Sequence, residues 1–341
     1  MAEFRLTVLN PGGRDPAQDF STGIASPDDG GHAPINFHGY AACTRGVFHR
    51  KVKHAIAEGL PVLLLLRSDF KETQRALHEF QRHGLPVAVA LKETGLHQIE
   101  KQLGDPNRAT RFREIVGKAD GCLAATPEAV QFYRAGQFIP TPYPLTDPRW
   151  DFSRPLGERK GIFVGTREWD VPSRHHLAAL VLALETGEPV TVFDEDPKQC
   201  RKVLAGLGLP VEELRIIRDR LPYREYLREM AQHKLVVQAD QSAVPGQVAG
   251  DALLCRLPCV GGNGAIDRIG FPSTSGYGRS LGELAELTRH LLREPGFYQE
   301  ITHQSQEQAR EQLDFAVVSA QLEQFFGQLG ALEGGHSACR G

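Results

Sequence analysis

Long apolar runs are missing from this sequence. The longest one, Leu60–Leu66, ends at Arg67, well short of the roughly 20 apolar residues that a membrane-spanning helix requires. The first residues also lack the charged-then-apolar order of a secretory signal. The sequence therefore predicts a soluble, cytoplasmic protein.

Cysteine is scarce, and neither sign of charge is in large excess. The six cysteines form no CxxC pair and no spacing typical of a metal site or a disulfide framework. Lys and Arg number 39 against 42 Asp and Glu, and no strongly basic cluster stands out, whereas nucleic-acid-binding domains usually carry one. We expect reduced cysteines and no nucleic-acid partner.

Two phosphate-binding motifs are absent as well. No stretch reads GxGxxG and none reads GxxxxGK[ST]. A dinucleotide-dependent oxidoreductase and a P-loop NTPase are therefore both disfavoured.

Short apolar stretches alternate with longer amphipathic ones, and the alternation occurs twice. This order is typical of βαβ units and parallel sheets. In the first half we expect strands at Phe4–Leu9, Pro61–Leu66, Pro86–Leu91 and Gly121–Ala125, a long loop over Asn10–Gly39, and helices at Tyr40–Glu58, Lys71–His83, within Gly95–Lys118 and from Thr126. In the second half we expect strands at Gly161–Gly165, Pro189–Phe193, Leu214–Ile217, Leu235–Gln238 and Pro258–Val260, and helices at Ser173–Glu185, Pro197–Leu207, Tyr223–His233, Gly246–Cys255 and within Leu281–Leu329.

A proline cluster separates the two halves. Ile139–Pro148 holds four prolines in ten residues and cannot continue a regular element. We predict an α/β protein with two Rossmann-like parallel-sheet domains, 1–148 and 149–310, facing a shared cleft. Residues 311–341 are expected to form a helix that packs back on the first domain, followed by a tail.

Glycine-rich loops follow one predicted strand in each half. Gly12 and Gly13 follow the first strand, and Gly262, Asn263 and Gly264 follow the last. In open α/β sheets ligands bind beyond the carboxyl ends of the strands, and loops without side-chain bulk let a phosphate or sugar approach the backbone. Taken singly, each loop is equally compatible with an ordinary turn.

Two arginines follow the predicted strand Gly161–Gly165. Arg167 and Arg174 lie where a guanidinium could neutralise a diphosphate. A solvated surface position is the alternative for both.

Four short segments of the second half occur in an order that is similar to a known family. They are Arg215–Tyr223, Val244–Gly246, Asp251–Leu253 and Leu257–Gly261. These segments resemble the donor-binding half of GT-B glycosyltransferases, closest to glycosyltransferase family 4, and the resemblance covers residues 119–328.

The resemblance implies transfer of a sugar from a nucleoside-diphosphate sugar to a hydroxyl acceptor, with no further cofactor and no metal. Asp251 stands where the family places its ribose-binding glutamate, whereas Ala243 stands where a second, sugar-side glutamate is found. By the same resemblance, the nucleotide base would lie near Arg220 and Leu221. The family's Arg and Lys near the diphosphate are not reproduced, and Arg167 and Arg174 are nearby substitutes. The positions after strands and the resemblance together give these candidate donor-binding residues: Gly12, Gly13, Arg167, Arg174, Arg220, Leu221, Gly246, Asp251, Gly262, Asn263 and Gly264.

Inverting transfer also needs a base for the acceptor hydroxyl. Lys92 and Glu93 follow the third strand, where members of the resembled family often carry a catalytic or acceptor-side histidine, and Glu93 is our first choice of base. His38 is a second candidate, although it could instead hydrogen-bond at the start of a helix.

Other interpretations stay open at this point. Asp194-Glu195-Asp196 has the DxD pattern of a metal-dependent glycosyltransferase, or it caps the helix that starts at Pro197. Basic residues within Tyr40–Glu58 could give a weak peripheral membrane contact or a solvated face. Because two carboxylate or cation positions of the family are altered, Ala243 among them, the chain could be a non-catalytic binding protein of the same shape, and a sugar-nucleotide 2-epimerase is the third alternative.

Overall fold

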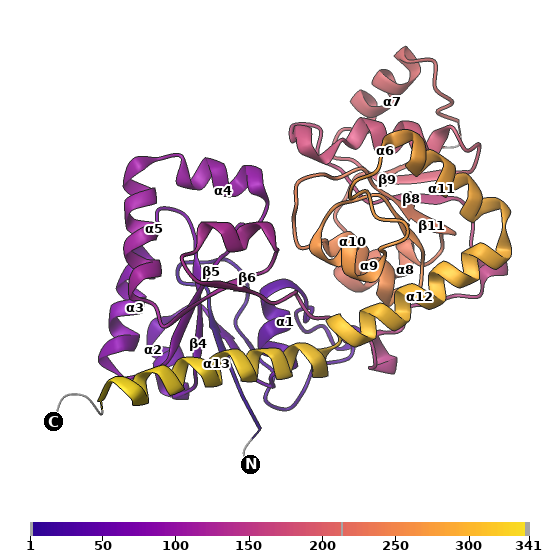
Figure 1. Ribbon diagram of the computed structural model, residues 1–341. Helices are drawn as coiled ribbons and strands as arrows, with labels where there is room; N and C mark the ends of the chain where they lie inside the picture. Colours follow the sequence, from indigo (N-terminus) through magenta and orange to yellow (C-terminus); the bar gives the residue numbers. More distant parts are fainter. Residues whose placement is uncertain (1–2, 213, 338–341) are drawn as a thin grey trace. The chain divides into compact units, whose positions relative to one another are not determined.

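The computed structural model describes residues 3–212 and 214–337. The chain divides into two compact units: unit 1 comprises Met1–Pro144 and Gln312–Gly341, and unit 2 comprises Leu145–Glu311 (Figure 1). The chain leaves unit 1 inside the proline-rich segment and returns to it near the end of α12 (Pro295–Leu313).

Unit 1 is built on a seven-stranded sheet in the order β2-β3-β1-β4-β5-β6-β7. Its strands are β1 (Thr7–Leu9), β2 (Gln18–Asp19), β3 (Val47–His49), β4 (Val62–Leu66), β5 (Val87–Leu91), β6 (Gly121–Ala124) and β7 (Gly136–Phe138). All neighbours pair in parallel except β2 with β3. The order reverses at β1, because β3 lies on one side of it and β4 on the other. Such a reversal is where an open α/β sheet binds its ligand.

Helices cover both faces of this sheet. They are α1 (Asn36–Cys43), α2 (Val52–Glu58), α3 (Lys71–Arg82), α4 (Leu96–Leu103), α5 (Pro106–Lys118) and α13 (Phe315–Ser337), with short 3-10 turns at Pro27–Asp29 and Glu128–Phe132. Successive residues of a strand point to opposite faces. In β4, Leu63 and Leu65 therefore join the core under α1 and α13, whereas Leu64 and Leu66 join the core under α2, α3 and α5.

The helix predicted at Tyr40–Glu58 is wrong. The segment instead forms α1, strand β3 and α2. At the break, Arg45 has a φ of 48° and a Cβ at Gly46 would lie 1.9 Å from the carbonyl oxygen of Leu6. The backbone thus turns sharply and comes close to β1, and the β-branched and aromatic pair Val47–Phe48 then pairs with that strand.

This break also removes the basis for a membrane-binding helix. The basic residues Arg45, Arg50, Lys51 and Lys53 lie on the connections around β3 and at the start of α2, not on one helical face. Within residues 3–212 and 214–337, no helix has both the length and the apolar character needed to cross a membrane.

Two smaller expectations also need correction. The helix expected from Thr126 is only a 3-10 turn, Glu128–Phe132, and the edge strand β7 follows it. The long loop predicted at Asn10–Gly39 contains β2, a 3-10 turn and the start of α1.

Unit 2 contains a five-stranded parallel sheet in the order β10-β9-β8-β11-β12. Its strands are β8 (Ile162–Val164), β9 (Val190–Phe193), β10 (Leu214–Ile217), β11 (Leu235–Val237) and β12 (Cys259–Val260). Counted along the unit, this order is 3-2-1-4-5, as in a Rossmann sheet. The predicted α/β fold with two Rossmann-like parallel sheets is confirmed, and the switch point of unit 2 lies between β8 and β11.

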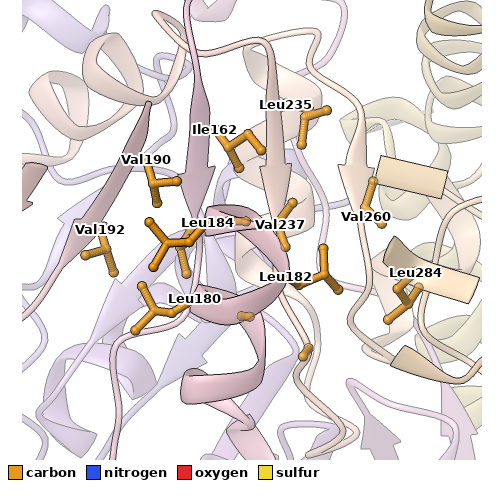
Figure 2. Close-up of a cluster of buried hydrophobic side chains, with 14 of the residues drawn as sticks. Ile162, Leu180, Leu182, Leu184, Val190, Val192, Leu235, Val237, Val260 and Leu284 are labelled. Carbon is orange, nitrogen blue, oxygen red and sulfur yellow. The ribbon is translucent and has the colours of Figure 1, made fainter. Parts of the chain in front are cut away.

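The helices of unit 2 pack on both sides of its sheet. They are α6 (His176–Leu184), α7 (Pro197–Gly206), α8 (Tyr223–Met230), α9 (Gln247–Leu254), α10 (Ala265–Gly270), α11 (Leu281–Arg293) and α12, and short 3-10 turns lie at Pro148–Trp150, Leu156–Glu158 and Pro172–Arg174. Ile162 of β8 joins Leu180 of α6 and Leu284 of α11 in one apolar cluster (Figure 2). Phe163 points to the other face, where its ring lies 5.8 Å from that of Tyr226.

Candidate functional site

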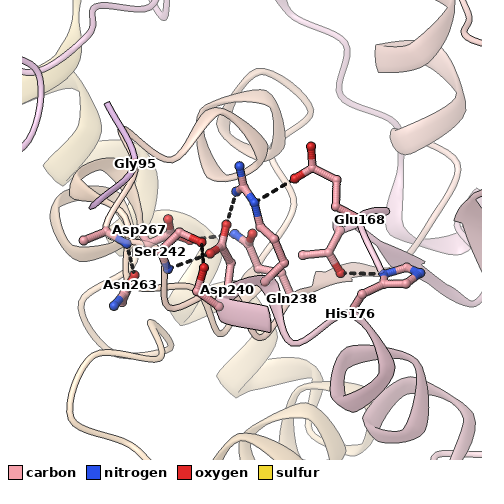
Figure 3. A network of polar contacts seen from close by, with 12 residues as sticks. Gly95, Glu168, His176, Gln238, Asp240, Ser242, Asn263 and Asp267 are labelled. Carbon is pink, nitrogen blue, oxygen red and sulfur yellow. Dashed lines mark hydrogen bonds and ion pairs between the residues drawn. The ribbon is translucent and has the colours of Figure 1, made fainter. Parts of the chain in front are cut away.

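Three loops of unit 2 follow neighbouring strands at the carboxyl edge of the sheet. They run from Gly165 after β8, from Gln238 after β11 and from Gly261 after β12. In parallel sheets this edge collects backbone N–H groups and helix N-termini, which attract anions. The polar side chains of these loops form the network in Figure 3.

Arg174 lies at the switch point and is held by two carboxylates. Its Nε lies 2.9 Å from Glu168 Oε2, and its Nη1 donates a hydrogen bond to Asp240 (Figure 3). The Asp240 carboxylate also accepts the backbone N–H of Ser242 at 2.7 Å. Next to this pair, the hydroxyls of Ser173 and Ser242 lie 2.8 Å apart. The sequence placed Arg174 in the donor site, and the structure places it between β8 and β11 with its charge already partnered.

Arg167 is exposed at the start of the same loop. Burial raises the pKa of the Tyr226 phenol, and the positive charge of Arg167 opposes the rise.

A buried carboxyl group, Asp267, lies behind the glycine loop. Its Oδ1 accepts a hydrogen bond from Gln238 Nε2 at 2.7 Å. Burial, together with repulsion from Asp240, raises the pKa of Asp267 to about 7, although a hydrogen bond from the Gly264 backbone opposes the rise. The carboxyl thus connects the end of β11 to the loop after β12.

Three of the predicted donor-site glycines surround this carboxyl group. A Cβ at Gly246 or Gly264 would lie 2.7 or 2.6 Å from Asp267 Oδ2, and one at Gly262 would lie 2.3 Å from Oδ1. Gly262 also has a φ of 73°, which side chains disfavour. Glycine is therefore needed at these positions to let the backbone close over Asp267.

Asn263 contacts the backbone of Ala243, the residue that stands where the resembled family carries its sugar-side glutamate. Its Oδ1 accepts the backbone N–H of Ala243 at 2.9 Å (Figure 3), and Ala243 has a φ of 48°. The side chain of Asn263 thus fixes a strained turn of the loop after β11.

Asp251 is fully buried in α9. Tyr223 donates a hydrogen bond to its Oδ1, and its side chain has no exposed surface. Burial raises the pKa of Asp251 to about 7, while the side chains of Tyr223, Gln247 and Tyr226 act to lower it. The ribose contact of Asp251 stays a prediction, because in this arrangement tyrosines surround the carboxyl group.

The predicted base-binding residues follow β10, which lies two strands from β8 in the sheet. Arg220 is exposed and lies 3.6 Å from Glu195, which is exposed too. Leu221 is half-buried. The structure therefore does not bring Arg220 and Leu221 into the network around Arg174.

The acidic run Asp194-Glu195-Asp196 has structural partners. Asp194 accepts a hydrogen bond from the indole of Trp169 at 2.6 Å, and Asp196 caps α7 through the backbone N–H of Gln199. No group of three or more His, Cys, Asp or Glu side chains suited to a metal ion occurs among the described residues. The capping interpretation of Asp196 is confirmed.

Unit 1 carries a second polar site, at its own switch point. The loop after β1 holds Gly12, with a φ of 67°, whose carbonyl accepts a hydrogen bond from Arg67 Nη1 at 2.9 Å. A Cβ at Gly13 would lie 2.2 Å from Asn10 Nδ2. The two predicted glycines thus shape the loop that leaves β1, and Arg67, which follows β4, contacts this loop.

Lys92, after β5, reaches this loop. Its Nζ lies 3.3 Å from Asp15, and Asn10 donates a hydrogen bond to the same carboxylate at 2.7 Å. Burial alone would raise the pKa of Asp15, but the charge and hydrogen bond of Lys92 together with Asn10 lower it. Asp15 is therefore an anion at neutral pH.

His38 joins the same cluster from α1. Its ring stacks on Phe48, with ring centroids 3.6 Å apart, and lies 4.1 Å from the ring of His32. Burial lowers the pKa of His38 to about 4, although a hydrogen bond to the Pro16 carbonyl opposes the shift. The imidazole is neutral at physiological pH, and one nitrogen contacts Pro16 O at 2.9 Å.

Glu93 is half-buried beside Lys92 and makes no hydrogen bond or ion pair in the described part of the chain. Its predicted role as base stays a prediction.

Three carboxylates of these sites were not predicted from the sequence: Asp15, Asp240 and Asp267. Each lies within a few residues of a strand's carboxyl end or of a glycine loop, and this position was the available signal.

The chain was also compared with known proteins. No protein-family model matches it, and no curated protein matches it. Solved structures do match over nearly the whole length. Anabaena HepE in complex with UDP and glucose has a TM-score of 0.60 and 14% identity, covering 95% of this chain and 100% of that one. The α,α-trehalose 6-phosphate synthase from Burkholderia multivorans has a TM-score of 0.59 and 10% identity, covering 97% and 100%.

A third match is AviGT4, a glycosyltransferase involved in avilamycin A biosynthesis. It has a TM-score of 0.52 and 14% identity, and covers 96% of this chain and 98% of that one. The chain has the GT-B fold. The similarity reaches across both units and is not confined to one Rossmann-like sheet.

Proposed function

We propose that this protein is a glycosyltransferase that moves a sugar from a nucleoside-diphosphate sugar to a hydroxyl acceptor. The observation that carries the proposal is a polar site at the switch point of each sheet, in a chain that matches glycosyltransferases of the GT-B fold over nearly its whole length. Similarity in fold does not select a family, so membership of glycosyltransferase family 4 is the finer part of the proposal and rests on the sequence segments around Asp251.

The donor's diphosphate would bind in unit 2, near Arg174 and the glycine loop Gly262–Gly264. A leaving diphosphate must be stabilised by positive charge or by aligned N–H donors. The guanidinium of Arg174, the exposed Arg167 and the backbone of the glycine loop supply both kinds of group at one sheet edge. No metal and no cofactor besides the donor enter this proposal.

We propose uracil as the donor's base. Matched structures of HepE and of an α-glucosyltransferase hold UDP. GDP- and ADP-sugars are the alternatives to test beside it.

Acceptor chemistry would take place in unit 1, around Lys92. Glu93 is the proposed base, because it is a carboxylate without an ion-pair partner in the described part of the chain. Lys92 forms an ion pair with Asp15. The low pKa of His38 makes its imidazole a weak proton acceptor. Lys92 and His38 therefore suit orientation of the acceptor by hydrogen bonds.

A panel of UDP-, GDP- and ADP-sugars tests the proposal. A ligand that binds only the folded state stabilises it by RT ln(1 + L/Kd), where L is the free ligand concentration, so the melting temperature rises with the logarithm of ligand concentration once the site is mostly occupied. We expect one donor to stabilise the protein and to be turned over with release of the nucleoside diphosphate. Stabilisation without turnover, even with acceptors supplied, would favour a non-catalytic binding protein, and an epimerised sugar on an intact nucleotide would favour a 2-epimerase.

A further inference from the structure

The two carboxylates that hold Arg174 differ in how firmly they are fixed. Asp240 has a side chain only 5% exposed and also accepts the Ser242 backbone N–H. The Glu168 side chain is 45% exposed. It lies in a segment without helix or strand, and Arg174 is its one hydrogen-bond or ion-pair partner in the described part of the chain. Asp240 is thus held by a second contact besides Arg174, whereas among the described residues Glu168 is held by Arg174 alone.

The two carboxylates also contact different parts of the guanidinium. Asp240 accepts a hydrogen bond from Nη1, whereas Glu168 lies 2.9 Å from Nε as an ion pair without hydrogen-bond geometry, so the buried Nε–H has no acceptor among the described residues. A guanidinium presents its five N–H donors in a fixed planar fork. If Glu168 leaves, Nε loses this ion-pair contact while Nη1 keeps its hydrogen bond to Asp240. Another anion can then bind to Arg174 without any movement of the arginine.

The charges around Arg174 favour replacement of Glu168 by another anion. One positive charge on Arg174 faces the negative charges of Glu168 and Asp240, so these three side chains together carry a net negative charge beside the proposed position of the donor's diphosphate. The carboxylates beside Arg174 would repel the negatively charged diphosphate, and this repulsion weakens its binding. Removal of the Glu168 charge would bring the pair Arg174–Asp240 to neutrality.

We propose that Glu168 occupies the anion position of Arg174 in the empty site and competes with the diphosphate of the donor. The inference rests on the proposed function. Donor binding exchanges the Glu168 carboxylate for a phosphate oxygen at Arg174 Nε, and Asp240 keeps the guanidinium in place during the exchange. Glu168 thereby limits affinity for the nucleoside diphosphate, which is also the product that must leave.

Titration calorimetry of Glu168→Gln tests the competition. UDP, GDP and ADP are titrated into the wild type and the variant, with the matching nucleosides as ligands that lack phosphate. We expect the variant to bind the preferred nucleoside diphosphate about threefold to fivefold more tightly, the range of an exposed ion pair. We expect affinity for the nucleoside to be unchanged, because the base and ribose do not compete with Glu168.

Asp170→Asn is the matched control. It removes an exposed carboxylate from the same loop, two residues further on, without touching Arg174. An equal gain in this variant would show a general charge effect and overturn the inference.

The double variant Glu168→Gln/Arg174→Gln decides whether the effect passes through the arginine. We expect no gain over Arg174→Gln alone. Unchanged or weaker binding by Glu168→Gln, or a full gain that persists without Arg174, would contradict the competition while leaving the proposed function intact. Absence of binding of every nucleotide to every variant would instead refute the proposed function, and the competition with it.

Discussion

Replacement of Asp251 by asparagine tests the most deeply buried carboxyl group of unit 2. Burial raises its pKa from 3.8 to about 7. Because the pKa is higher in the folded state, the contribution of this carboxyl group to stability is greatest below about pH 3.8, where the group is protonated in both states. Its contribution to the free energy of unfolding then falls as the pH rises from 3.8 through 7. A difference of about three pKa units corresponds to about 4 kcal/mol of lost stability above pH 7. An amide does not ionise and avoids this loss.

The expected result is therefore a stability difference that depends on pH. Relative to the wild type, Asp251→Asn should gain about 2–3 kcal/mol in free energy of unfolding between pH 5 and pH 8. Urea denaturation of both proteins at the two pH values measures it, and Asp170→Asn, which replaces an exposed carboxyl of the same unit, is the control. A difference between Asp251→Asn and wild type that stays constant with pH would refute the argument that Asp251 is forced into a desolvated position.

Three further predictions concern the glycine loop, the proposed base and the returning helix. Gly262→Ala places a Cβ 2.3 Å from Asp267 Oδ1 and should abolish nucleotide-induced stabilisation in a thermal melt. Its control is Gly278→Ala, where φ is similar but no heavy atom of the described residues lies within 4 Å of the added Cβ. This control should lower the free energy of unfolding by only about 1 kcal/mol and leave nucleotide binding intact. Glu93→Gln should lower kcat about 100-fold with the donor KM unchanged, and a kcat within twofold of wild type would remove Glu93 as the base. Phe325→Ala should destabilise the protein by about 3–5 kcal/mol in urea denaturation, whereas a loss below about 1 kcal/mol would show that α13 contributes little to the core of unit 1.

The strands could be predicted well from the sequence because most are continuous apolar runs. β4 and β5 are buried on both faces, and their residues Val62–Leu66 and Val87–Leu91 coincide closely with the expected runs. Proline and capping residues marked several helix starts, as at α7, where Asp196 accepts the N–H of Gln199.

Short elements were missed where tertiary contact outweighs local pattern. In the sequence alone, Val47–His49 has the pattern of an amphipathic helix, and only its pairing with β1 makes it a strand. Gly46 is needed because the backbone of Leu6, 40 residues earlier in the chain, lies close to it. No window of sequence contains that contact.

The candidate site was predictable in position but not in its partners. Strand order and glycine loops led to Arg174 and to Gly262, and the structure brings both to the carboxyl edge of unit 2. Pairing of Arg174 with Asp240, 66 residues later, depends on β11 lying beside β8. The pairing of Asp15 with Lys92 likewise requires the folded sheet of unit 1.

Turnover of a nucleotide-sugar donor would establish the proposed glycosyltransferase activity. The purified protein is incubated with UDP-glucose and other UDP-sugars, then GDP- and ADP-sugars, and both products are followed: the free nucleoside diphosphate and the sugar on water or an added acceptor. We expect stoichiometric release of one nucleoside diphosphate with transfer of its sugar, and a strong loss of turnover in Arg174→Gln. Intact donors throughout, with no nucleotide-induced stabilisation at any concentration, would contradict the proposed activity.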